Sequence, residues 1–133
     1  MDNHKFILQG ACWCGLGMAL GAFGAHGLKQ VATPTGLQTF ETAVRYLVYH
    51  GFAILICGIL AAQQPHRFIR QAAKLFTAGI FLFSGSLVLM VTLEWQGITG
   101  WQKLGAITPL GGLAFILGWI QLARAHWSPQ KSG

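Results

Sequence analysis

Apolar residues form four long stretches along the chain, and short polar segments separate them. The stretches cover about residues 6–28, 43–62, 72–93 and 104–123. A helix that crosses a bilayer needs about 20 mostly apolar residues, so each stretch is long enough. Turn-forming and charged residues fill the gaps, which read "KQVATPTG", "QQPHRFIRQ" and "EWQGITGWQK". We therefore predict an all-α integral membrane protein, with one domain folded as an antiparallel bundle of four transmembrane helices.

The second helix is expected to begin before its apolar stretch. Thr35 followed by Gln38 is a capping-box pattern, and apolar positions then recur at a helical period. Glu41 and Arg45 are one turn apart, so they can pair on one helix face. The first stretch follows Lys5 and could also be a secretory signal, but its length favours a retained helix.

Composition supports the membrane assignment. Hydrophobic residues make up 53% of the chain and charged residues 9%, against about 25% charged residues in ordinary soluble domains. The formal net charge is +6, and a basic balance can indicate nucleic-acid binding. Here the basic residues lie mainly between the apolar stretches, so we interpret them as flanks of membrane helices and expect no nucleic-acid partner.

The positions of Lys and Arg predict the orientation. With four helices, the N-terminus, the second gap and the C-terminus share one side of the membrane. That side carries most of the basic residues, namely Lys5, Arg67, Arg70, Lys74, Arg124 and Lys131. Because basic residues favour the cytoplasmic side, both termini are predicted to be cytoplasmic, in a bacterial inner (cell) membrane. Trp95 and Trp101 then mark the outer interface, and Trp119 and Trp127 the inner one.

Small residues predict close helix packing. On the first helix one stripe contains Gly10, Cys14, Gly17, Gly21 and Gly24, and the opposite stripe contains Gly15, Ala19, Ala22 and His26. Small residues let transmembrane helices approach closely, so we expect this helix to lie wedged between neighbours. The helix-packing positions predicted along the whole chain are Gly17, Gly21, Gly24, Gly79, Gly112 and Gly118.

Polar residues inside the apolar stretches are the candidate site. We expect them to form a layer in the outer half of the bundle, made of His26, Glu41, Arg45, Tyr46, Tyr49, His50, Ser84, Ser86 and Thr108. An unpaired polar group in hydrocarbon costs several kcal/mol, so His26 is expected to point inward, towards the second or third helix. Two interpretations stay open: hydrogen bonds that join helices, or a ligand or proton site.

Catalytic and metal chemistry find little support. Ser84 or Ser86, a histidine and Glu41 could form a nucleophilic site, but no catalytic signature accompanies them. His26 and His50 could hold a haem in principle, but they differ in expected depth. The cysteines, Cys12, Cys14 and Cys57, are interpreted as small buried apolar residues. We expect no enzyme activity, no metal and no cofactor.

Four segments in this order also carry a family resemblance: "LGAFGAHGLK", "FETAVRYLVYHGFAIL", "LFSGSL" and "GAITPLGGLAFILGW". The chain resembles the domain-of-unknown-function 423 family, which includes small bacterial inner-membrane proteins and the animal transmembrane protein 256. The resemblance covers nearly the whole chain. It implies a small multi-pass membrane protein and supplies no mechanism. One departure is Leu47, where the family often has glutamine.

Two classes of function fit these features. The first is a non-enzymatic membrane protein that binds a lipid or a small apolar molecule, or serves as an assembly partner. The second is proton-linked or small-solute transport, with a homo-oligomer supplying the pore because four helices are few. A lipid-modifying enzyme rests on the serines and histidines alone. The expected partners are therefore the bilayer, a lipid or small apolar ligand, and a second copy of the chain.

Overall fold

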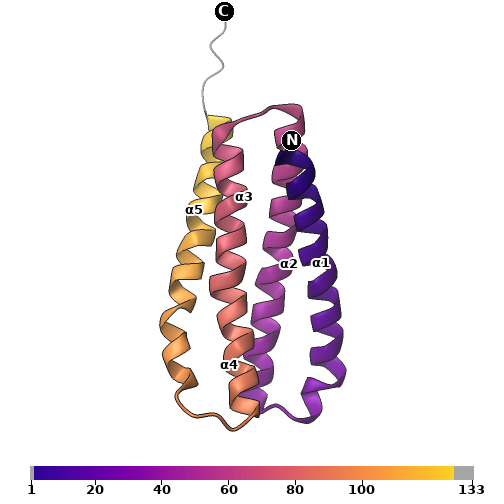
Figure 1. Cartoon of the computed structure of the whole chain (residues 1–133), viewed down its shortest axis with the longest axis vertical. Coiled ribbons are helices and arrows are strands. Elements are labelled where there is room, and N and C mark those ends of the chain that lie inside the picture. Colours follow the sequence, from indigo (N-terminus) through magenta and orange to yellow (C-terminus); the bar gives the residue numbers. More distant parts are fainter. Residues whose placement is uncertain (1, 128–133) are drawn as a thin grey trace, which may run out of the picture.

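The computed structural model describes residues 2–127 and is an antiparallel helical bundle (Figure 1). Within these residues four segments are long and apolar enough to cross a membrane. Their helices are α1 (Asp2–His26), α2 (Pro34–Gln63), the continuous series α3 (Arg67–Gly79), η2 (Ile80–Gly85) and α4 (Ser86–Trp95), and α5 (Thr108–Trp127). Two short 3₁₀ turns, η1 (Leu28–Gln30) and η3 (Trp101–Ala106), precede α2 and α5. The predicted all-α four-helix membrane fold is confirmed.

The helices are arranged with α2 and α3–η2–α4 in the centre. α1 packs mainly on α2, and α5 packs on α3 and η2 (Figure 1). The most deeply buried side chains lie where the two central helices meet, and include Ile54, Cys57, Ile69 and Phe76. The start of α1, the α2–α3 turn and the end of α5 share one end of the bundle (Figure 1). We call it the basic end, because Lys5, Arg67, Arg70, Lys74 and Arg124 belong to the segments there.

α1 approaches α2 closely along its glycine stripe. A Cβ on Gly10 would lie 2.6 Å from the Leu55 backbone nitrogen, and one on Gly24 would lie 2.9 Å from the Phe40 ring. Gly17 meets the Val48 side chain, whereas Gly21 is looser, at 3.7 Å from Val44. Small residues here therefore allow two backbones to come together.

The expectation that α1 is wedged between neighbours is wrong. Its opposite stripe, which contains Gly15, Ala19, Ala22 and His26, is exposed. Among the described residues, no atom outside the helix backbone comes within 4 Å of a Cβ built on Gly15. The physical reason is the position of α1 at the edge of the bundle. Its neighbour α2 takes one face, and the other face has no helical neighbour among the described residues.

Glycines also admit large rings between α3 and α5. The Phe115 ring lies directly over Gly79, and the Phe76 ring lies 2.6 Å from a Cβ built on Gly118. The close backbone approach of α5 is at Gly111, which touches the backbone at Phe83, rather than at the predicted Gly112. A Cβ on Gly112 would make only ordinary contact with Phe83, at 3.9 Å.

The start of α2 also differs from the expected cap. The Thr33 hydroxyl accepts a hydrogen bond from the Gly36 backbone N–H at 3.0 Å, so Thr33 is the N-cap and Thr35 lies inside the helix. Pro34 explains the shift, because proline has no N–H to lose and its fixed φ suits the first helical position. The same hydroxyl donates to Glu94 Oε1 at 3.3 Å, which ties the start of α2 to the end of α4.

The third membrane helix contains a π-helical segment, Ile80–Gly85, that no sequence pattern indicated. π segments are rare and often accompany functional sites, because the wider turn redirects the side chains around it. Ile80 and Ser84 are buried in the bundle, whereas Phe83 is half-buried on the side of α2 and α5. The segment therefore shapes the space between these two helices.

Candidate functional site

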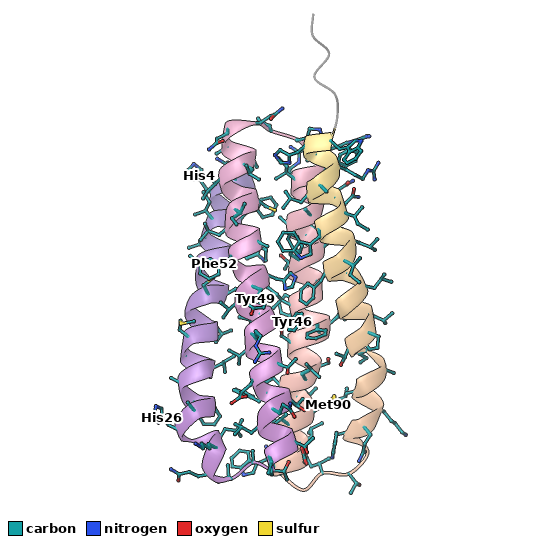
Figure 2. The ribbon with its side chains drawn as sticks, turned by 180° about the vertical axis from the view of Figure 1, so that it is seen from behind. His4, His26, Tyr46, Tyr49, Phe52 and Met90 are labelled. Atoms are coloured by element: carbon teal, nitrogen blue, oxygen red, sulfur yellow. The ribbon has the colours of Figure 1, made fainter. Side chains whose placement is uncertain are left out.

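A groove lined mainly by aromatic side chains separates α2 from α5. We call it the aromatic groove, and its volume is about 700 Å³. Figure 2 shows three of its residues, Tyr46, Tyr49 and Phe52, halfway along the bundle. The full lining is Tyr46, Tyr49, His50, Phe52, Phe83, Gly112, Phe115, Ile116 and Trp119. Three helical segments thus bring an aromatic surface together.

His50 lies buried at the base of this groove, with 4% of its surface exposed. Its Nδ1 lies 2.7 Å from the Tyr46 carbonyl oxygen, and its Nε2 accepts a hydrogen bond from Trp119 Nε1 at 3.1 Å. Because an indole nitrogen can only donate, Nε2 is the acceptor and the proton is on Nδ1. The two bonds therefore hold a neutral imidazole in one tautomer.

One-turn spacing on two helices builds this arrangement. Tyr46 and His50 are four residues apart on α2, and Phe115 and Trp119 are four residues apart on α5, so each pair shares a helix face. The His50 ring stacks on the Phe115 ring, with centroids 3.5 Å apart and planes 7° apart. Gly79 beneath Phe115 leaves room for that ring. The small residue on α3 therefore lets α5 reach the histidine of α2.

The aromatic groove opens sideways, towards the surface that faces hydrocarbon in a membrane. The exposed fractions are 56% for Tyr49, 53% for Phe52 and 59% for Ile116. α2 has 30 residues and is therefore about 45 Å long, against a hydrocarbon core of about 30 Å. His50 lies near the middle of α2. Because α2 begins at Pro34, well before its apolar stretch, the midpoint of the helix lies towards the Pro34 end of that stretch, and the placement of His50 in the outer half of the bundle stays a prediction.

The predicted serines and Thr108 form separate contacts between helices. Ser84 Oγ donates to the Ala43 carbonyl oxygen of α2 at 2.7 Å. Ser86 Oγ donates to the Phe83 carbonyl oxygen at 2.9 Å and shares a 2.7 Å hydrogen bond with Thr108 Oγ1. The His50 nitrogens bond to other groups, so neither serine is activated by this histidine. These bonds join the third helix to α2 and α5.

His26 lies away from all these groups. It is the last residue of α1, is exposed, and points away from the other helices at the end opposite the basic end (Figure 2). The prediction that it points inward is wrong. At 100° per residue, His26 is turned about 200° from Gly24, and Gly24 is the residue that faces α2.

Glu41 and Arg45 lie on another side of α2. Both are exposed, at the edge of a shallow hollow of about 310 Å³ between α1 and α2. The structure contains no ion pair between these two side chains. The predicted polar layer thus separates into a buried histidine site, bonds between helices and two exposed charges.

Trp119 and Phe115 are the site residues that sequence reasoning missed. Trp119 was expected in the interfacial aromatic belt; its indole N–H donates a hydrogen bond to the buried His50, while 47% of its surface stays exposed. The spacing of Phe115 and Trp119, one turn apart after Gly111, was the signal available. A different tryptophan, Trp13, packs edge-on against Phe81 at 5.2 Å, and its Nε1 is buried with no hydrogen-bond partner in the described part of the chain.

The cysteines and possible metal ligands are spread out. Cys57 is buried, Cys14 is half-buried and Cys12 is exposed, so the expectation of buried cysteines is wrong for Cys12. Cys12 lies on the face of α1 that has no helical neighbour. Within residues 2–127, no group of three or more His, Cys, Asp or Glu side chains could hold a metal ion.

Comparison with known proteins gives one consistent family. The model of the family described as "Protein of unknown function (DUF423)" matches residues 20–112. The chain is 41% identical to UPF0382 membrane protein SAB0533 of Staphylococcus aureus, over 88% of this chain and 90% of that protein. It is also 41% identical to UPF0382 membrane protein YwdK of Bacillus subtilis, over 90% of this chain and 94% of that protein. No solved structure matches. The chain therefore belongs to the DUF423 family and is a membrane protein.

Proposed function

We propose that the protein binds a small apolar molecule from the bilayer in the aromatic groove and does not change it chemically. The observation that supports this proposal most is the hydrogen bond from Trp119 to the buried His50 at the base of a groove that stays open to the lipid side. Ligand sites are typically concave and apolar, with a few polar groups that fix orientation. The aromatic groove has these features about halfway along the bundle (Figure 2).

The shape and chemistry of the groove favour a flat molecule. The rings of Tyr46, His50 and Phe115 are nearly parallel, with the Tyr46 and His50 planes 12° apart and the Tyr46 and Phe115 planes 19° apart. Tyr46 is 38% exposed, so a flat ring in the groove can stack on its ring. The hydroxyls of Tyr46 and Tyr49 can donate to an acceptor atom of the ligand. The favoured ligand is therefore a lipid-soluble molecule with a flat ring that carries an oxygen acceptor.

A groove-filling variant tests this proposal. Gly112 lines the groove, and a Cβ there makes only ordinary contact, so Gly112→Leu fills the space without displacing a helix. Gly15→Leu on the exposed face of α1 is the matched control, because the same side chain is added far from the groove. Protein purified from membranes in mild detergent is analysed by native mass spectrometry.

The expected result is a bound molecule of defined mass on the wild type and on Gly15→Leu, and its loss from Gly112→Leu. Equal occupancy in both variants would place the molecule elsewhere. The proposal would be contradicted if none of the three proteins carried a bound molecule, even after incubation with total membrane lipid extract.

Proton-linked transport is the alternative, and it would use His50 as the group that carries the proton. Both ring nitrogens of His50 are engaged, one by the Tyr46 carbonyl and one by Trp119. Protonation at Nε2 would have to break the Trp119 hydrogen bond. We therefore favour binding over transport. A pH-driven flux into liposomes that exceeds empty vesicles, and that His50→Phe abolishes, would reverse this preference.

We also infer that the basic end faces the cytoplasm of a bacterial cell. The support is the collection of Lys and Arg at that end, because cytoplasmic loops carry an excess of these residues. The test is membrane-impermeant thiol labelling of intact cells, with Cys12, Cys14 and Cys57 replaced by serine. A new cysteine at Gln102 should react from outside, and one at Gln64 should react only after lysis. The opposite pattern would invert the topology.

A further inference from the structure

Two arginines from different helices converge on one phenylalanine ring at the basic end. The guanidinium carbon of Arg67, the first residue of α3, lies 4.7 Å from the centre of the Phe68 ring. The guanidinium carbon of Arg124, in the last turn of α5, lies 4.3 Å from the same centre. Each contact is a favourable cation–π interaction. The ring therefore gathers two like charges in a small volume.

A chain of hydrogen bonds fixes one of these arginines. Arg124 Nη1 donates to Gln121 Oε1 at 3.1 Å, and Gln121 Nε2 donates to Gln71 Oε1 on α3 at 3.1 Å. Gln121 thus holds Arg124 towards α3. An arginine whose only role is to mark a cytoplasmic loop needs no such positioning.

Among the side chains that the structure describes, no acidic residue is placed to neutralise this pair. The chain has three acidic residues. Glu41 and Glu94 lie towards the opposite end, near the start of α2 and the end of α4 (Figure 1). Arg67 also stands at the N-terminus of α3, where the helix dipole disfavours a cation and favours an anion. The surroundings of the two arginines therefore favour a bound anion.

We propose that Arg67 and Arg124 bind the phosphate of an anionic phospholipid. Guanidinium groups bind phosphate oxygens through paired hydrogen bonds, which makes arginine well suited to this role. The site lies at headgroup depth, beside the exposed Trp127 at the end of α5. Below it, Ile120 and Leu117 continue the helix face of Arg124 and are 49% and 42% exposed. An acyl chain can lie along these side chains, which a free phosphate ion would leave uncovered.

Lipid titration of the purified protein tests this site. The protein in neutral detergent is titrated with phosphatidylglycerol, with phosphatidylcholine and with inorganic phosphate, and bound lipid is measured by native mass spectrometry. The variant is Arg67→Gln with Arg124→Gln. The matched control is Arg70→Gln with Lys74→Gln, which removes the same charge from two exposed positions of α3.

The expected loss of phosphatidylglycerol affinity is about thirtyfold in the Arg67/Arg124 variant, since each basic side chain near the surface contributes about 1 kcal/mol. The control pair should lose clearly less. Equal losses in the two variants would show diffuse attraction and overturn the site. Competition by inorganic phosphate at millimolar concentration, or equal affinity for phosphatidylcholine, would overturn the anionic lipid as its ligand.

A second variant guards against a folding defect. Gln121→Glu places a carboxylate where Arg124 already donates, so the protein itself would neutralise the arginine. The carboxylate cannot donate to Gln71 as Gln121 does, but the Gln71 side-chain amide can turn and donate to it instead. We expect an unchanged or raised unfolding temperature together with weaker phosphatidylglycerol binding. Unchanged binding in this folded variant would contradict the proposal.

Discussion

The indole N–H of Trp119 donates to Nε2 of His50, 3.1 Å away, and so joins α5 to α2 at the base of the aromatic groove. At this depth α2 and α5 are joined through side chains. The buried imidazole keeps both nitrogens paired, and the groove beside it stays open.

Removal of the tryptophan donor should destabilise the fold. Trp119→Phe keeps a ring at this position but leaves His50 Nε2 buried without a donor. A buried unsatisfied acceptor costs about 1–3 kcal/mol, so the free energy of unfolding in mixed micelles should fall by that amount. Trp95→Phe is the control, since Trp95 is 55% exposed, and it should change the value by less than about 0.5 kcal/mol.

A double-mutant cycle isolates the bond itself. His50→Leu is combined with Trp119→Phe, and the two single variants complete the cycle. Hydrogen bonds between transmembrane helices contribute about 0.6 kcal/mol on average and up to about 1.7 kcal/mol, so a coupling in this range is expected. Strictly additive effects would show that the two side chains do not interact in the folded protein.

The glycines of α1 should differ sharply in their tolerance of a methyl group. In Gly10→Ala the new Cβ meets the Leu55 backbone nitrogen at 2.6 Å, and backbone cannot move aside as a side chain can. Overpacking typically costs about 1–3 kcal/mol. Gly15→Ala adds the same atom in open space, and alanine favours the helix by up to about 1 kcal/mol. Equal unfolding free energies for the two variants would mean that α1 does not pack on α2 through this stripe.

The helix cap gives a test at the other end of the bundle. Thr33→Ala removes both the bond from the Gly36 N–H and the bond to Glu94. Loss of an N-cap costs about 0.5–2 kcal/mol. Thr35→Ala should be nearly neutral, because the Thr35 side chain is exposed within the first turn. If Thr35→Ala lowered the free energy of unfolding more than Thr33→Ala, Thr35 would be the N-cap of α2, as the capping-box pattern predicted.

The apolar pattern predicted the fold because membrane spans depend on length and hydropathy, which are local properties. The same pattern located the narrow stripe of α1 at Gly10, Gly17 and Gly24. It could not decide which of two narrow faces has a neighbour, and His26 was misplaced for that reason. The choice depends on where α1 sits in the bundle, and the sequence of α1 alone does not contain that information.

Part of the candidate site could not be predicted from the sequence. His50 was recognised because an ionisable residue in a span needs a reason. Its partners were not, because Trp119 lies near the end of an apolar stretch, where tryptophan usually anchors to the interface. The π-helical segment that turns Phe83 towards the groove has no known local signature in "IFLFSG". Such features depend on packing between helices distant in the chain.

Photocrosslinking from the groove tests the proposed function most directly. Ile116 lines the groove, whereas Leu113 is similarly exposed on α5, at 52%, and is not part of the groove lining. Each is replaced by p-benzoylphenylalanine, and the protein is irradiated in native membranes and analysed by mass spectrometry. The account predicts one dominant adduct of defined mass from Ile116, which Gly112→Leu suppresses, and a mixture of bulk phospholipids from Leu113. The same phospholipid mixture from both positions would contradict a specific ligand in the aromatic groove.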